Sequence, residues 1–145
     1  MTVLFEFDAR ELSGLTRQLQ GLGEADFGEL VDSLAMEGES QTRRRIEVEK
    51  ESPSGDVWVE WSDRYAKTRH AGQSLLESEG GLVDSIESGS RGGDVYFGSD
   101  LIYAASMQYG DDKRGIPARE YVGFSRDNKR DLEAIMESFL ANVLA

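Results

Sequence analysis

Few residues in this sequence are of a type that could do catalytic chemistry. The chain has no cysteine and a single histidine, His70, which lies in a polar stretch next to glycine. These counts exclude disulfides, thiolate zinc sites, cysteine nucleophiles and metal sites that need two histidines. A serine hydrolase would have to be built around His70, and no nucleophile-elbow motif accompanies it. We therefore expect a protein that is not an enzyme, with no catalytic residue, no metal and no other cofactor.

Two further polar clusters are better explained as exposed loops. Asp111-Asp112-Lys113 continues into basic residues, whereas a calcium loop needs more carboxylates. The glycine-rich residues 88–93 lack the spacing and the lysine of a phosphate-binding loop, so we interpret them as the exposed loop of a hairpin. With 28 Asp and Glu residues, some pair of carboxylates will always be close in space. A carboxylate pair is therefore not a specific sign of acid–base catalysis.

The spacing of apolar residues predicts the elements that must position any site. Alternating apolar residues indicate strands, and apolar residues three or four apart indicate amphipathic helices. On this basis we expect strands over residues 2–8, 94–99 and 121–124, and helices over residues 9–22, 26–46, 62–69, 81–87, 103–109 and 132–144. Asp26 is placed to cap the second long helix, and residues 52–56 form a turn.

The apolar pattern of the second long helix fades between residues 36 and 45. Gly38 is expected to weaken its middle by about 1 kcal/mol relative to Ala. We therefore expect this stretch to be exposed, or covered by another subunit. The basic run Arg43-Arg44-Arg45, with Glu47 and Glu49 nearby, is interpreted as a solvated helix face, and a surface that faces a partner is the alternative.

Length and composition favour one compact domain over residues 1–145. The elements indicate an α+β fold: a small antiparallel sheet with long N-terminal helices and a C-terminal amphipathic helix packed on it. The apolar runs are far shorter than the roughly 20 residues that cross a bilayer, and no secretory signal is apparent, so we expect a cytoplasmic protein. The net charge of −12 argues against general binding to nucleic acid or anionic membranes.

A series of short motifs then resembles a known family. The motifs, in order, are Pro53-x-Gly55-x-x-Trp58, Trp61-Ser62, Tyr65, Leu76, Gly80-Gly81-Leu82, Ser85-Ile86, Tyr103-Ala104-Ala105, Gln108-Tyr109-Gly110 and Ile116-Pro117-Ala118-Arg119-x-Tyr121-Val122-Gly123. Their order and spacing resemble the phage virion morphogenesis family, the tail-completion group of Mu-like and P2-like phages. The chain departs from the family pattern at Glu79, Met107 and Glu120-Tyr121, positions that concern packing and choice of partner.

The resemblance implies a structural protein of the virion neck, assembled in the cytoplasm of the bacterial host. It would complete the tail and join it to the DNA-filled head, as a ring of copies of itself in contact with other neck and tail proteins. We expect six copies, with DNA passing through the lumen without sequence-specific binding. The acidic charge suits such a lumen, since phosphates bound to many lysines would stall the DNA.

A closed ring needs two different patches that meet between neighbours. We place the contact on the second long helix and residues 58–65, with residues 110–121 as its other half; the alternative is that the latter segment folds onto its own subunit. In the contact, Arg119 would pair with a carboxylate and Tyr121 would bury its ring. The candidate residues are Trp58, Trp61, Tyr65, Tyr109, Ile116, Pro117, Arg119 and Tyr121. A different class of function also remains open: an acidic adaptor or regulatory domain that binds a basic protein partner.

Overall fold

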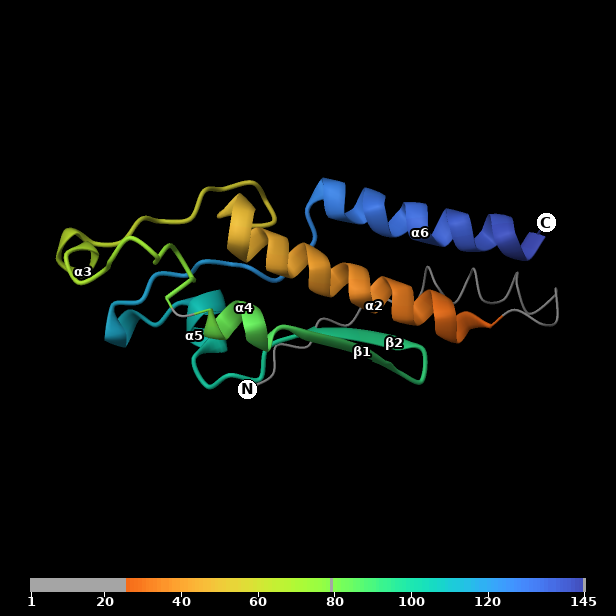
Figure 1. The fold of residues 1–145 in the computed structure, drawn as a ribbon, viewed down its shortest axis with the longest axis horizontal. Coiled ribbons are helices and arrows are strands. Elements are labelled where there is room, and N and C mark those ends of the chain that lie inside the picture. Colours follow the sequence, from red (N-terminus) through yellow and green to blue (C-terminus); the bar gives the residue numbers. More distant parts are fainter. Residues whose placement is uncertain (1–25, 79, 145) are drawn as a thin grey trace.

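The computed structural model describes residues 26–78 and 80–144. A long helix, α2 (Phe27–Arg44), runs along the molecule. The C-terminal helix α6 (Arg126–Leu144) lies along one side of α2, and a hairpin of β1 (Glu87–Arg91) and β2 (Asp94–Gly98) packs on another side (Figure 1). The expected α+β class is confirmed, with α2 as the element that both the sheet and α6 contact. The expected elements at residues 2–8 and 9–22 lie outside the described residues.

The start of α2 agrees with the sequence prediction. The Asp26 side chain accepts a hydrogen bond from the Gly28 backbone N–H at 2.9 Å, which satisfies one of the unpaired donors of the first turn. The apolar side chains Leu30, Val31 and Leu34 are buried in the core. After Arg44 the helix widens into one π-helical turn, η1 (Arg45–Glu49), and ends at Lys50 in the left-handed region with φ 55°.

The expectation that residues 36–45 are exposed or covered by another subunit is wrong for one face of this stretch. Gly38, Gln41 and Thr42 are buried by the hairpin and α6 of the same chain. A Cβ atom on Gly38 would lie 2.6 Å from two ring atoms of Phe97 on β2, so the glycine permits close packing of the hairpin on the helix. The apolar pattern fades because the buried contacts here are made by small and polar residues.

The three arginines of the basic run, Arg43, Arg44 and Arg45, do not all face solvent, contrary to the expectation. Arg44 is exposed and lies 3.4 Å from Glu49, as expected of a surface arginine. Arg43 pairs with Glu39 at 3.1 Å and donates to the Ile86 carbonyl oxygen at 2.7 Å. Arg45 is fully buried. Three adjacent arginines on a helix point in three directions, and the third points into the core.

The expected exposed loop at residues 88–93 is mostly the strand β1. Glu87 pairs with Gly98 and Arg91 with Asp94, so only Gly92 and Gly93, both with positive φ, form the turn. The hydroxyls of Ser88 and Ser90 donate to carboxylates of α2, Glu39 at 2.6 Å and Asp32 at 2.8 Å. A loop-like composition forms a strand here because its serines bind polar groups on α2. Strand β2 lies where it was predicted.

Shorter helices agree with the predicted positions. They are α3 (Asp63–Ala66), α4 (Gly81–Ser85) and α5 (Ala104–Tyr109), and a 3-10 turn, η2 (Asp112–Arg114), follows α5. The hydroxyl of Ser62 caps α3 by accepting from the Tyr65 N–H, and Gly110 ends α5 with φ 75°. Helix α6 begins earlier than predicted because Ser125 and Asn128 bond each other's backbone N–H, the reciprocal arrangement of a capping box.

The strand expected at residues 121–124 is absent, because side chains rather than a neighbouring strand satisfy its backbone. Gln108 Oε1 accepts from the N–H groups of Tyr121 and Val122 at 3.0 Å each, and its Nε2 donates to the Val122 carbonyl at 3.1 Å. The Arg45 guanidinium donates to the carbonyls of Tyr121 at 3.0 Å and Gly123 at 3.2 Å, and also to Asn128 Oδ1. A buried segment must have its polar backbone groups paired, and here the side chains of Gln108 and Arg45 do so.

Gly38→Ala tests the packing of the hairpin on α2. Helix propensity alone favours Ala by about 1 kcal/mol. The new methyl group would overlap the Phe97 ring, so we expect the free energy of unfolding to fall by about 1–3 kcal/mol in urea denaturation. Ser40→Ala, at an exposed position two residues later, is the matched control, with a change within about 0.5 kcal/mol. A stabilised Gly38→Ala would contradict the close contact.

Arg45→Met tests the buried guanidinium. Its removal leaves the carbonyls of Tyr121 and Gly123 and the side chain of Asn128 without their buried donor, so we expect a loss of about 3 kcal/mol of unfolding free energy. The neighbouring exposed Arg44→Met should change stability by less than about 0.5 kcal/mol. Equal effects of the two substitutions would show that the Arg45 contacts contribute nothing beyond a surface arginine.

Candidate functional site

A groove lies at the end of the molecule that carries α3. Its volume is about 1320 Å³. One wall is the arm, residues 57–78, which extends beyond the body formed by α2, α6 and the hairpin (Figure 1). The other wall is formed by α5 and residues 112–117. The arm has little regular secondary structure beyond α3, so its position depends on side-chain contacts.

Two side chains join the arm to the segment that follows the other wall. Arg119 donates from Nε to the Val59 carbonyl at 2.8 Å and from Nη2 to the Glu60 carbonyl at 3.4 Å. Its own backbone N–H bonds to the Met107 carbonyl on α5 at 2.9 Å. Trp58 Nε1 donates to the Glu120 carbonyl at 2.9 Å. These contacts hold the arm against the segment that follows α5.

Lys50 fixes the far end of the arm. From the end of η1 its ammonium donates to Ser74 Oγ at 3.0 Å, to the Leu75 carbonyl at 2.7 Å and to Glu77 Oε2 at 2.9 Å. Ser74 Oγ also donates to the Glu77 carboxylate at 2.7 Å. Burial of the Glu77 carboxyl raises its pKa, but the hydrogen bonds from Lys50 and Ser74 and the Lys50 charge lower it more, so the pKa lies below its ordinary value.

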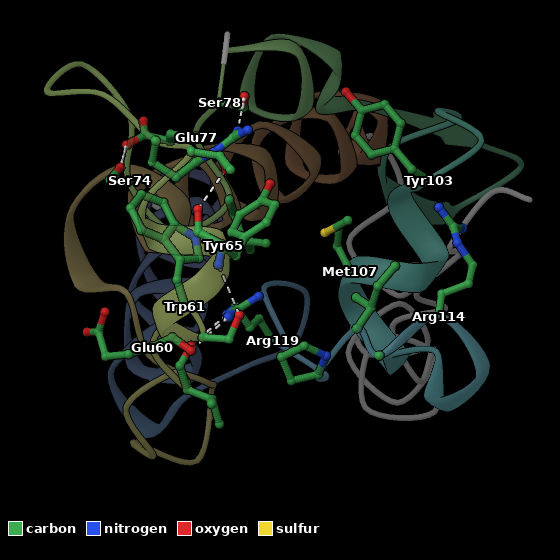
Figure 2. Close-up of a pocket in the computed structure, with 18 of the residues that line it drawn as sticks. Glu60, Trp61, Tyr65, Ser74, Glu77, Ser78, Tyr103, Met107, Arg114 and Arg119 are labelled. Carbon is green, nitrogen blue, oxygen red and sulfur yellow. Dashed lines mark hydrogen bonds between the residues drawn. The ribbon is translucent and has the colours of Figure 1, made fainter.

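The groove combines aromatic and aliphatic surface with arginines. Trp61 and Tyr65 meet edge to face at 6.1 Å, and the Arg69 guanidinium lies over the Tyr65 ring at 4.5 Å. Figure 2 shows these aromatic residues on one wall, facing Tyr103, Met107 and Arg114 across the groove. Tyr65 and Tyr103 are 47% and 40% exposed. Broad apolar surface with guanidinium groups is typical of protein contact surfaces.

The structure places five of the eight predicted contact residues on this groove: Trp61, Tyr65, Ile116, Pro117 and Arg119. The segments expected to form opposite halves of a subunit contact, residues 58–65 and 110–121, are thus largely joined in one groove. Tyr109 is exposed away from it, at 65%.

Three predicted contact residues are bound within their own chain. Tyr121 is fully buried, and its hydroxyl donates to the Ala104 carbonyl at 3.0 Å, so its ring is not available to a neighbour. The carboxylate pair expected for Arg119 is replaced by two backbone carbonyls. Trp58 is also buried. The alternative weighed for this segment, that it folds onto its own subunit, holds for Arg119 and Tyr121, since both lie against their own chain.

Burial changes the acid–base behaviour of these groups. Burial lowers the pKa of the guanidinium of Arg45 and of Arg119, with carboxylates of Glu49 and Glu60 acting in the opposite direction. Burial raises the pKa of the Tyr121 phenol.

Sequence reasoning did not name six groove residues as contact residues: Arg64 and Arg114, although the predicted segments 58–65 and 110–121 contain them, and Arg69, Leu76, Tyr103 and Met107. A local signal existed: residues 64–70 contain three basic residues and no acidic one. Over the wider range 51–100 the acidic residues outnumber the basic ones, so the local excess of basic residues at 64–70 was overlooked.

Within residues 26–78 and 80–144, no group of His, Asp and Glu side chains could hold a metal ion. His70 lies exposed in the arm, where its backbone N–H bonds to Gln73 Oε1. In the same part of the chain, no helix has the length and apolar character needed to cross a membrane.

Comparison with known proteins identifies the family. The profile of the phage virion morphogenesis family matches residues 8–141. The chain belongs to this family. Comparisons with curated proteins and with solved structures each returned no match. The resemblance inferred from the motifs between Pro53 and Gly123 is therefore confirmed, and the match extends well beyond them on both sides. A phage structural role follows from membership of the virion morphogenesis family.

Glu77→Gln tests how the arm is fixed. Because the folded-state pKa of Glu77 is below its ordinary value of 4.5, the carboxylate adds stability that is present above that value and is lost as pH falls through the lower folded pKa. We expect urea denaturation to show a wild type more stable than Glu77→Gln at pH 7, with a difference that shrinks below pH 4.5. Glu47→Gln, which removes an exposed carboxylate, is the control. A difference that does not change with pH would contradict the assigned contact.

Proposed function

We propose that this chain is a tail-completion protein of the phage neck, which assembles as a ring and joins the tail to the DNA-filled head without catalysing a reaction. The observation that carries the proposal is the match to the virion morphogenesis family over residues 8–141. The groove supports it, because a surface of exposed aromatic side chains and arginines suits docking of another protein. We further propose six copies in the ring, in contact with other neck and tail proteins.

Charge supports passage of DNA through such a ring. With 28 acidic and 16 basic residues, a chain that lines a channel brings an excess of anions, which repel phosphates rather than hold them in place. The cations that line the groove are concentrated at one end of the molecule, where a contact between proteins would cover them. On this proposal DNA slides through the lumen without sequence-specific binding.

The proposal predicts the phenotype of a phage that lacks this protein. Induction of such a phage should yield DNA-filled heads and separate tails in electron micrographs, and supply of the wild-type protein in trans should restore joined virions. The purified protein should give a closed ring in negative stain, with a mass by light scattering of about six times the monomer. Normal joined virions in the absence of the protein would overturn the proposal. They would favour the acidic adaptor that binds a basic partner.

A further inference from the structure

The end of the molecule opposite the groove is strongly acidic. It is formed by the first part of α2 and the last part of α6, which pack side by side with the rings of Phe27 and Phe139 5.8 Å apart. Residues 26–40 and 133–143 together contain seven Asp and Glu residues and no Lys or Arg. Figure 1 shows this end at the opposite extreme of the long axis from α3.

The groove has the opposite charge once internal pairs are taken into account. Its lining includes the cations Arg64, Arg69, Arg114 and Arg119, and the anions Glu60, Glu77 and Asp112. Glu77 is paired with Lys50 at 2.9 Å, which removes one anion. Among the described residues Arg64 has no ion pair, and Arg114 approaches Asp111 only at 4.0 Å with its side chain 64% exposed. Exposed guanidinium groups are thus available to a partner.

The last part of α6 has the chemistry and size that this groove would accept. Glu133 and Glu137 are exposed and one turn apart, so their carboxylates lie on the same face of the helix. Nearby Leu140 and Val143 are only half-buried by their own chain. Ile135, Met136 and Phe139 pack on the chain's own core, so this part of α6 offers its outer face, about 16 Å long, to the groove. Docking of an amphipathic helix in a groove is a common mode of protein recognition.

We propose that residues 133–143 of one copy bind in the groove of a second copy, with Glu133 and Glu137 paired to Arg64 and Arg114. This inference rests on the self-assembly in the proposed function and names its contact. Two chains of charge −12 repel each other overall, so copies associate only where charge is locally complementary. The groove and the acidic helix end lie at opposite ends of one chain, so each copy can receive one neighbour and enter another, as a heterologous contact requires.

Charge reversal tests the contact with purified full-length protein. The groove variant Arg64→Glu/Arg114→Glu and the helix variant Glu133→Arg/Glu137→Arg each place like charges together. Each should therefore raise the concentration for half-maximal assembly at least about tenfold in light scattering. An equimolar mixture should assemble as the wild type does, because every neighbouring pair of different variants is again complementary. The control Glu47→Arg/Arg91→Glu reverses exposed charges outside the groove and helix end, and should leave assembly unchanged.

A cross-link tests the same contact if the wild type is monomeric at the concentrations reached. The chain has no cysteine, so Arg64→Cys and Glu137→Cys introduce single thiols. Under mild oxidation the mixture should form a disulfide-linked dimer that contains both variants, well above the level of dimer that either forms alone. Equal dimer levels in all three samples, or failure of the charge-reversed mixture to recover, would overturn the contact. The yield of joined virions tests the proposed function by itself. A failure of the proposed contact and a failure of the proposed function can therefore be distinguished.

Discussion

The buried guanidinium of Arg45 is the interaction on which the rest of the structure depends. It lies at the start of the π-helical turn that ends the long helix and donates to the carbonyls of Tyr121 and Gly123. Burial of a cation is costly unless its donors are paired, so the segment that supplies the carbonyls has little freedom to move. The same segment continues back through Glu120 and Arg119, which hold the arm. Helix α2, the C-terminal helix and the groove are thus connected through one side chain.

Polar side chains pair with the backbone of residues 121–123, a role that a third strand of the sheet has in many domains. Gln108 alone pairs with both N–H groups and one carbonyl of residues 121–122. Asn128 starts α6 and also accepts from Arg45, so the start of that helix is fixed to the end of α2. In such a network each group has few alternative partners, because an unpaired polar group in the core costs about 1–3 kcal/mol. The result is a defined path for a segment with no regular secondary structure.

This network also explains what the sequence could and could not predict. Apolar periodicity is a strong signal, and it correctly located α2, α6, α5 and β2, whose buried residues follow it. The path of residues 121–124 had no such signal, because Arg45, Gln108 and Asn128 are polar residues distant in the sequence whose burial depends on the tertiary fold. The strand β1 was missed for a related reason: Ser88 and Ser90 bond carboxylates of α2 through their hydroxyls and do not pack on apolar side chains.

In the candidate site, too, the sequence indicated the position of some residues but not the contacts of others. Four residues predicted from the motifs, Trp61, Tyr65, Ile116 and Pro117, line the groove, whereas Trp58, Arg119 and Tyr121, also predicted to contact another subunit, bond within their own chain. Their bonds lie within the chain, and they set how the arm meets the body. In a head-to-tail assembly the angle between neighbours decides whether copies close into a ring or continue as a filament. Because the arm forms one wall of the groove, in the proposed contact these three buried residues would set that angle without contacting a neighbour.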